Sequence, residues 1–193
     1  SLLTSSVASA DVSYNVGFVS EYYYRGIYQK NASASAGIDY EQSGFYAGAW
    51  TADVGDGLEV DGYLGYGGEV GDFAYGVGFT GYYYTGDFDE TYEEVNLSAG
   101  YGPVSIGYSI GEWDGDGGTD YDFLEVSIDL GAGFYGLYGS FGDEFDGDYF
   151  ELGYGTTVSE IDLGVALIFP SDELEGTDNA AGEGITLSIG KSF

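Results

Sequence analysis

The last ten residues, 184–193, alternate strictly between large apolar side chains and small or polar ones. Successive side chains of a β-strand point to opposite faces, so an extended segment with this pattern has one apolar face and one small, polar face. The apolar face carries Ile185, Leu187 and Ile189, and the opposite face carries Thr186, Ser188 and Gly190. The same two-sided pattern recurs along nearly the whole chain, which restricts it to a β fold.

This alternation predicts about twelve strands, each close to the ~10 residues with which a tilted strand crosses an outer membrane. The segments are 11–21, 33–41, 45–54, 58–67, 73–83, 94–101, 104–110, 124–130, 134–141, 149–157, 161–169 and 184–193. In the third segment the two faces are less distinct. The longest apolar run, 165–169, is far shorter than the ~20 residues of a membrane helix.

The connections between these segments alternate in length. The short ones are 42–44, 69–72, 102–103, 131–133 and 158–160. The longer, acidic ones are 25–31, 55–57, 86–90, 114–120, 143–148 and 170–182. Short turns at one rim, longer loops at the other and an even strand number are typical of bacterial outer-membrane barrels.

The polar face separates the two architectures that this pattern allows. In a soluble sandwich the apolar face points inward and the exposed face carries bulky solvated groups. Here the polar face holds Gly, Ser, Ala and a few acids, which suit the confined interior of a barrel. We therefore expect an all-β transmembrane up-and-down antiparallel barrel over residues 11–193, with a soluble β-sandwich as the alternative.

Composition excludes several kinds of chemistry. The 193 residues include no Cys and no His, so disulfides, thiolate or imidazole metal sites and His-activated nucleophiles are ruled out. With 3 basic and 34 acidic residues the formal net charge is −31, which repels nucleic acid. We expect no enzymatic activity, because no pair of carboxylates is singled out by its spacing.

The first ten residues differ from the rest. They end in Ala8-Ser9-Ala10, the small-x-small pattern of a signal-peptidase site. We interpret residues 1–10 as the tail of a secretory signal peptide with Asp11 as the mature N-terminus; an ordinary polar leader is the alternative.

The segment V-S-E-Y-Y-Y-R-G-I-Y-Q-K at 19–30, followed by G-I-D-Y at 37–40 and S-G-F-Y-A-G-A-W at 43–50, resembles the TorF-like porin family of small proteobacterial outer-membrane proteins. The family pattern is roughly V-S-x-Y-x-x-R-G-x-S-Q, then G-x-D-Y, then S-G-x-Y-x-G-x-W. Tyr28 departs from it, where the family usually has Ser. The resemblance is specific over 19–50 and implies an outer-membrane porin of unsettled solute.

Nine acids fall on the face expected to line the lumen: Asp39, Glu41, Glu59, Asp61, Glu94, Glu125, Asp129, Glu151 and Asp162. A water-filled channel ringed by carboxylates favours cations, because its low-dielectric wall focuses the field. The alternative is that these acids hydrate a nearly closed interior. Arg25 is either a constriction residue paired with a lumen carboxylate such as Asp39 or Glu59, or a structural ion pair that fixes the first loop.

The acidic loops suggest weak divalent-ion binding. Residues 114–125 match the ligand spacing of an EF-hand loop but lack its central Gly and lie between strands, so we regard the match as coincidence. A weak Ca²⁺ site on the loops remains a prediction, with the candidate ligands Asp114, Asp116, Asp120, Asp122, Asp143, Asp146 and Asp148. Bridging through Ca²⁺ or Mg²⁺ to lipopolysaccharide would follow from it.

Tyr and Phe residues near the strand ends suit the aromatic girdles of a membrane barrel, and cross-strand packing explains any single one equally well. They are Tyr22, Tyr23, Tyr82, Tyr83, Tyr84, Tyr101, Phe141, Tyr149 and Phe193.

The sequence as a whole predicts an outer-membrane porin for passive diffusion of small solutes, with a preference for cations. The alternative is a non-conducting structural or surface-interaction barrel whose acidic loops bind divalent ions. The expected partners are outer-membrane lipid, lipopolysaccharide and small solutes or cations. The sequence leaves the oligomeric state open, including a homo-oligomer.

Overall fold

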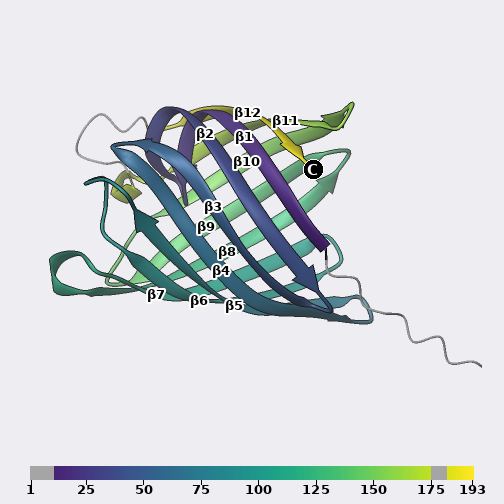
Figure 1. The fold of residues 1–193 in the computed structure, drawn as a ribbon, viewed down its shortest axis with the longest axis horizontal. Coiled ribbons are helices and arrows are strands. Elements are labelled where there is room, and N and C mark those ends of the chain that lie inside the picture. Colours follow the sequence, from purple (N-terminus) through teal and green to yellow (C-terminus); the bar gives the residue numbers. More distant parts are fainter. Residues whose placement is uncertain (1–10, 175–181) are drawn as a thin grey trace, which may run out of the picture.

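The computed structural model describes residues 11–174 and 182–193, and within them twelve antiparallel strands close into one barrel (Figure 1). The strands are β1 (Asp11–Tyr24), β2 (Ile27–Gln42), β3 (Phe45–Gly55), β4 (Gly57–Val70), β5 (Phe73–Tyr84), β6 (Tyr92–Tyr101), β7 (Val104–Trp113), β8 (Thr119–Gly131), β9 (Phe134–Asp143), β10 (Asp148–Val158), β11 (Ile161–Pro170) and β12 (Gly184–Ser192). Each strand pairs with its neighbours in sequence, and β1 pairs with β12 to close the barrel. The predicted twelve-stranded barrel is confirmed. The signal-peptide interpretation of residues 1–10 lies outside the described residues.

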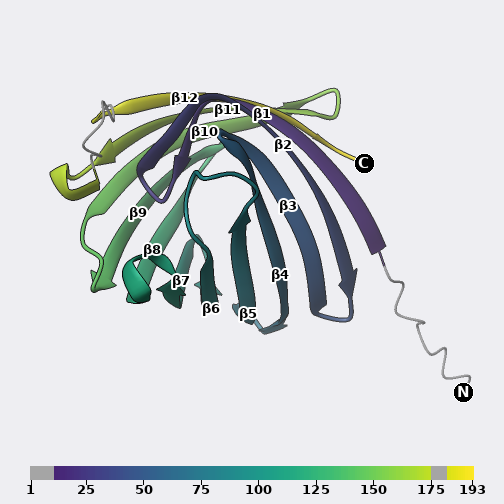
Figure 2. The same ribbon diagram turned by 60° about the vertical axis from the view of Figure 1, so that its left-hand side comes forward.

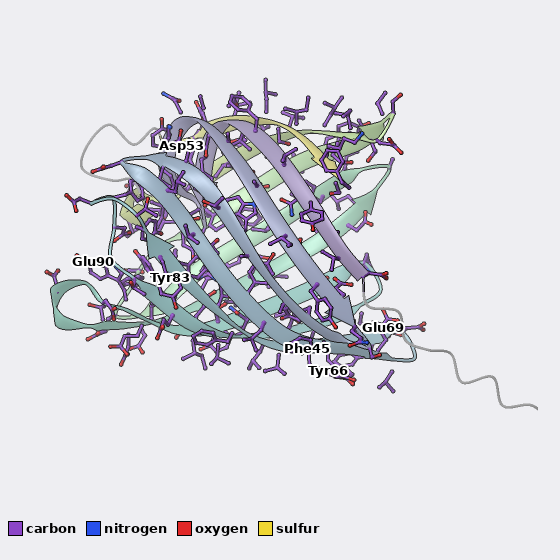
Figure 3. All side chains as sticks on the ribbon, in the orientation of Figure 1. Phe45, Asp53, Tyr66, Glu69, Tyr83 and Glu90 are labelled. Atoms are coloured by element: carbon purple, nitrogen blue, oxygen red, sulfur yellow. The ribbon has the colours of Figure 1, made fainter. Side chains whose placement is uncertain are left out.

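The aliphatic side chains point outward along the strands. Leu64, Ile110 and Leu187 expose 52%, 54% and 57% of their surface, as members of continuous rows on neighbouring strands. Figure 3 shows Phe45 and Tyr66 on the outer surface near one rim and Tyr83 toward the other. An outer face this apolar belongs in hydrocarbon and not in water, which rules out the sandwich.

The two rims differ as predicted for the short turns, and in part for the longer loops. Five two-residue turns join β2–β3, β4–β5, β6–β7, β8–β9 and β10–β11 at the rim that also holds the start of β1 and the end of β12. Short hairpins of this kind use residues with positive φ, and Ser43-Gly44 and Ala132-Gly133 have them. The opposite rim holds the four longer connections, β5–β6, β7–β8, β9–β10 and β11–β12, together with the tight β1–β2 and β3–β4 turns, and it carries two single-turn 3₁₀ helices, η1 (Gly115–Gly117) and η2 (Asp172–Leu174). Within the described ranges no helix is long and apolar enough to cross a membrane.

The predicted first long loop, 25–31, is wrong. Arg25 and Gly26 alone form the turn, with φ of 48° and 81°, and β2 begins at Ile27. Beyond Arg25 and Gly26 the segment is neither acidic nor rich in turn residues. Residues 27–31 therefore continue the ribbon as part of β2. The predicted longer loop 55–57 is wrong as well, because β3 ends at Gly55 and β4 begins at Gly57, with only residue 56 between them. Loops 114–120 and 143–148 are shorter than predicted, since β8 starts at Thr119 and β9 ends at Asp143.

The outer third of the β1–β2 hairpin leaves the barrel wall. Pairing of β1 with β12 stops at Val19, and pairing of β2 with β3 stops at Ser35, while β1 and β2 remain paired to each other up to Tyr24 and Ile27. Beyond these points the hairpin is a two-stranded ribbon held by itself. Figure 2 shows this end bending away from the wall and across the mouth of the barrel.

Two local irregularities accompany the bend. The register between β1 and β2 shifts at Tyr22/Tyr23, and Ala32 on β2 has a φ of 58°. Such bulges increase twist and redirect a strand. Side chains bond the backbone where the ribbon departs: Ser20 Oγ accepts from the Leu187 N–H, and the Thr186 hydroxyl donates to the Glu21 carbonyl. These bonds satisfy backbone groups that the wall ladder no longer reaches.

The barrel interior near the long-loop rim is filled by aromatic and aliphatic side chains. The buried cluster consists of Tyr121, Phe123, Phe141, Tyr149, Ile168 and Leu174. The girdle prediction is therefore wrong for Phe141 and Tyr149, which lie inside. It agrees with the outward exposure of Tyr83, Tyr101 and Phe193.

Candidate functional site

Arg25, at the tip of the hairpin, reaches the far wall of the barrel. Its Nη1 donates to Glu94 Oε2 at 2.9 Å and its Nη2 to Glu94 Oε1 at 2.7 Å, a bidentate pair on β6. Nη2 also donates to Ser109 Oγ on β7 at 3.2 Å, and the guanidinium lies 4.2 Å from the ring centre of Phe123 on β8. Strands β6–β8 lie opposite β1 in the closed order, so the tip crosses the lumen.

Arg25 pairs with one of the nine acids expected on the lumen face, Glu94, and not with Asp39 or Glu59, the two given as examples. Asp39 instead accepts hydrogen bonds from Asn15 at 3.2 Å and from Tyr63, and Glu59 accepts from Tyr22 at 2.6 Å. The alternation of the strands identifies the lumen face, but it does not tell how far the hairpin bends. Arg25 forms a buried ion pair inside the barrel, and its role as the constriction of a pore stays a prediction.

A shell of donors surrounds the Glu94 carboxylate, whose side chain has 0% exposure. Tyr82 donates to it at 2.9 Å, Tyr121 at 2.8 Å and Asn96 at 2.8 Å, in addition to Arg25. A buried carboxylate requires such a set, because every unmet acceptor site carries a desolvation cost. We call Arg25, Glu94, Tyr24, Tyr82 and Tyr121 the constriction.

Two further carboxylates are buried beside the constriction. Glu59 is 1% exposed and accepts hydrogen bonds from Tyr22 and, at 3.0 Å, from Tyr84. Asp61 is 8% exposed, and its Oδ1 has no hydrogen-bond partner in the described part of the chain. The girdle prediction is wrong for Tyr22, Tyr82 and Tyr84, whose hydroxyls bind lumen carboxylates. Sequence reasoning missed this role because three consecutive Tyr at a strand end conceal the alternation.

The other predicted lumen acids are spread along the inward positions of their strands: Asp39, Glu41, Glu125, Asp129, Glu151 and Asp162. Glu151 accepts a hydrogen bond from Tyr135 at 2.5 Å, Asp162 from Thr157 at 2.6 Å, and Asp129 from the Gly131 N–H at 2.7 Å. The structure thus gathers Glu59, Asp61 and Glu94 and separates the rest. That these residues line a conducting pore stays a prediction.

The hairpin tip separates two internal spaces. On the short-turn side lies a cavity of about 560 Å³ whose lining includes Arg25, Gly26, Glu151 and Ser188. On the long-loop side lies a pocket of about 150 Å³ whose lining includes Tyr24. Gly26 is required at the tip, because its φ is 81° and a Cβ there would lie 2.6 Å from Tyr149 Cγ.

All three basic residues of the chain are paired. Besides Arg25–Glu94, Lys30 pairs with Asp53, and Lys191 Nζ lies 3.4 Å from Glu160 Oε2. Arg25 is the one of these placed in the constriction, and Glu94 neutralises it. Glu59 and Asp61 therefore have no basic partner among the described residues.

The loop acids predicted to bind Ca²⁺ do not converge. Asp120 and Asp122 lie within β8, Asp143 ends β9, and Asp148 starts β10, where it accepts from Tyr138 at 2.9 Å. Asp114, Asp116 and Asp146 lie in the connections. Across residues 11–174 and 182–193, no group of three or more acidic side chains is arranged to hold a metal ion. Calcium binding by these residues stays an untested prediction.

The barrel is similar to solved outer-membrane porins of Pseudomonas. OccK2 (OpdF) of Pseudomonas aeruginosa, solved in complex with glucuronate, is 16% identical with a TM-score of 0.46, covering 91% of this chain and 62% of that one. A BenF-like porin from Pseudomonas fluorescens Pf-5 is 13% identical with a TM-score of 0.41, covering 91% and 59%. The chain thus spans about three fifths of their length. The barrel assignment rests on the strand pairing and exposure above, and likenesses at this level say nothing of its solute.

No curated protein matches the sequence. A family model described as "Bacterial protein of unknown function (Gcw_chp)" matches residues 4–167, while membership of the TorF-like porins is not confirmed. Membrane-spanning barrels of bacteria lie in the outer membrane, so this barrel is an outer-membrane protein. Because the matched residues make up most of the chain, it belongs to the Gcw_chp family of bacterial proteins.

Proposed function

We propose that the protein is a passive diffusion channel of the outer membrane whose narrowest point is the hairpin tip. The observation that supports this most is the Arg25–Glu94 pair, which joins the tip of β1–β2 to the opposite wall across a lumen lined by polar residues. A hairpin that folds into a barrel narrows the lumen and leaves the wall of paired strands in place. The cavity of about 560 Å³ on the short-turn side is the space through which a solute would continue.

We further propose that the channel prefers cations. Glu94 neutralises Arg25, so the constriction adds no net positive charge, while the adjacent carboxylates Glu59 and Asp61 have no basic partner. Charge of one sign inside low-dielectric walls focuses the field and enriches counter-ions. The same placement of acids along the inner strands supports passage of cations or small neutral solutes over anions.

Planar bilayers with a KCl gradient test both proposals. We expect single channels with a reversal potential on the cation side, and Arg25→Gln should raise conductance and shift the reversal potential further toward K⁺. Lys191→Gln is the matched control, since that residue sits in an exposed pair at the rim and not in the lumen. Anion-selective currents, or an Arg25→Gln channel indistinguishable from the parent, would contradict the cation-selective pore.

One observation favours a non-conducting structural barrel as the second candidate. The cluster around Tyr121, Phe123 and Phe141 fills the lumen beside the tip with apolar side chains, and Ile27 of the hairpin packs against it. In that case both the parent protein and a variant with a released tip would be silent in bilayers while still migrating on gels as folded barrels. The apolar exterior implies contact with outer-membrane lipid in either case. Lipopolysaccharide bridging through divalent ions remains a proposal.

A further inference from the structure

A small pocket at the outer mouth is walled mainly by aromatic rings. It encloses about 150 Å³ between the hairpin tip, the β5–β6 connection and the β9–β10 connection. We call it the outer aromatic pocket, and its principal walls are Tyr24, Tyr84, Asp89, Tyr92, Tyr121 and Phe145. One water needs ~10–15 Å³ of such space and drug-sized ligands occupy ~300–1,000 Å³, so the pocket suits a small organic group.

The one charged wall is negative. Asp89 Oδ1 accepts from Trp113 Nε1 at 3.0 Å, and Oδ2 accepts from the Tyr92 hydroxyl at 2.9 Å, which fixes the carboxylate at the pocket. A second carboxylate, Glu59, lies behind Tyr84 and accepts its hydroxyl at 3.0 Å. Neither acid is part of an ion pair with the three basic residues, each of which has another partner.

The tyrosine rings are polarised toward binding a cation. Tyr84, Tyr92 and Tyr121 each donate their hydroxyl to a carboxylate, of Glu59, Asp89 and Glu94 respectively. Donation to an anion pushes electron density into the ring, and electron-rich ring faces attract cations. Next to the pocket, the Arg25 guanidinium already lies 5.1 Å from the ring centre of Tyr24.

A second space lies next to this pocket, toward the long-loop rim. It measures about 400 Å³ and shares Ile27, Phe141 and Phe145 with the outer aromatic pocket. Its remaining lining includes the acids Glu144, Asp146 and Glu173. Further carboxylates therefore lie beside the aromatic walls on the long-loop side.

We infer that the outer aromatic pocket binds small alkylammonium cations, an inference that rests on the proposed cation-preferring channel and names its ligand class. An alkylammonium cation holds its hydration water weakly and loses little on entering an aromatic pocket. Na⁺ and K⁺ hold their water more strongly, and aromatic rings cannot replace it, so the pocket favours the alkylammonium cation. Asp89 supplies the opposite charge. A neutral molecule of the same shape would gain the apolar contacts but not the attraction to the rings and the carboxylate.

Tryptophan fluorescence in detergent micelles tests the inference. The chain has two Trp, and Trp50→Phe leaves Trp113, whose indole contacts Asp89, as the sole reporter. Tetramethylammonium chloride should change this fluorescence saturably, whereas NaCl at equal ionic strength and neopentyl alcohol, a neutral analogue of similar shape, should not. Asp89→Asn should weaken binding by roughly tenfold or more, because it removes the charge and keeps the shape. Asp72→Asn, in a turn at the opposite rim, is the matched control and should bind as the parent does.

The inference is overturned if tetramethylammonium gives no saturable change in Trp113 fluorescence, or if neopentyl alcohol binds as tightly as tetramethylammonium does. It is also overturned if the Asp89→Asn variant binds tetramethylammonium with unaltered affinity. Micelle binding requires no current, so its failure is distinguishable from failure of the channel proposal. If the barrel conducts K⁺ selectively but does not bind tetramethylammonium, only the inference about the pocket's ligand is refuted. If the barrel binds tetramethylammonium but never conducts, the channel proposal is refuted and the inference about the pocket's ligand stands.

Discussion

Replacement of Arg25 by Ala probes the contact that defines the constriction. The change removes two charge-assisted hydrogen bonds, at 2.7 and 2.9 Å, from a carboxylate with 0% exposure. Breaking a buried pair by removing one partner costs about 3–5 kcal/mol, because the remaining charge is uncompensated. Tyr82, Tyr121 and Asn96 continue to donate to Glu94, so we expect the lower end of that range, about 3 kcal/mol.

The double variant Arg25→Ala/Glu94→Gln separates lost charge compensation from lost packing. Without the Glu94 charge, the penalty should fall to about 1 kcal/mol, the ordinary net worth of a hydrogen bond. The free energy of unfolding is measured in urea with the barrel in lipid vesicles, followed by Trp fluorescence. Lys191→Ala is the control, since its pair with Glu160 is long and exposed and should contribute less than about 1 kcal/mol.

Two results would refute this reasoning. An Arg25→Ala barrel within about 1 kcal/mol of the parent would mean that the tip is not held by a buried pair. A double variant no more stable than Arg25→Ala would mean that the loss comes from packing and not from the stranded Glu94 carboxylate.

Three further predictions follow from the exterior, the tip and the loops. Leu64→Arg, in the middle of an outward row, should reduce the unfolding free energy by about 2–4 kcal/mol in vesicles, and Val70→Arg at the strand end by about 0–1 kcal/mol; equal losses would contradict the membrane placement. Gly26→Val should release the tip, because its Cβ would lie 2.6 Å from Tyr149 Cγ at a φ of 81°, and single-channel conductance should rise while the barrel stays heat-modifiable on gels. An unchanged conductance would show that the tip does not narrow the pore. Since the loop acids do not converge, Ca²⁺ should raise the melting temperature only at about 0.1–1 mM or above, and a micromolar response would reveal a built site.

The faces of the wall were predictable because strand alternation is a local property. Ile185, Leu187 and Ile189 point outward whatever the rest of the chain does, provided that the small, polar face lines a cavity. The same period placed the nine lumen acids on the inner positions and the short turns at one rim. Prediction failed at strand ends, where Tyr82 and Tyr84 were assigned to the girdle by their position along the strand, although the unbroken alternation of β5 places them inward and Tyr83 outward.

The sequence by itself thus determined a β-barrel with its apolar side outward and its acids inward, because period-2 patterning requires no long-range information. Only the tertiary structure decided what lies inside. Arg25 and Glu94 are separated by 69 positions, and closure of the barrel together with the bend of the ribbon brings them together. The outer aromatic pocket likewise combines side chains from several strands and connections, whose meeting depends on that bend and on no local pattern.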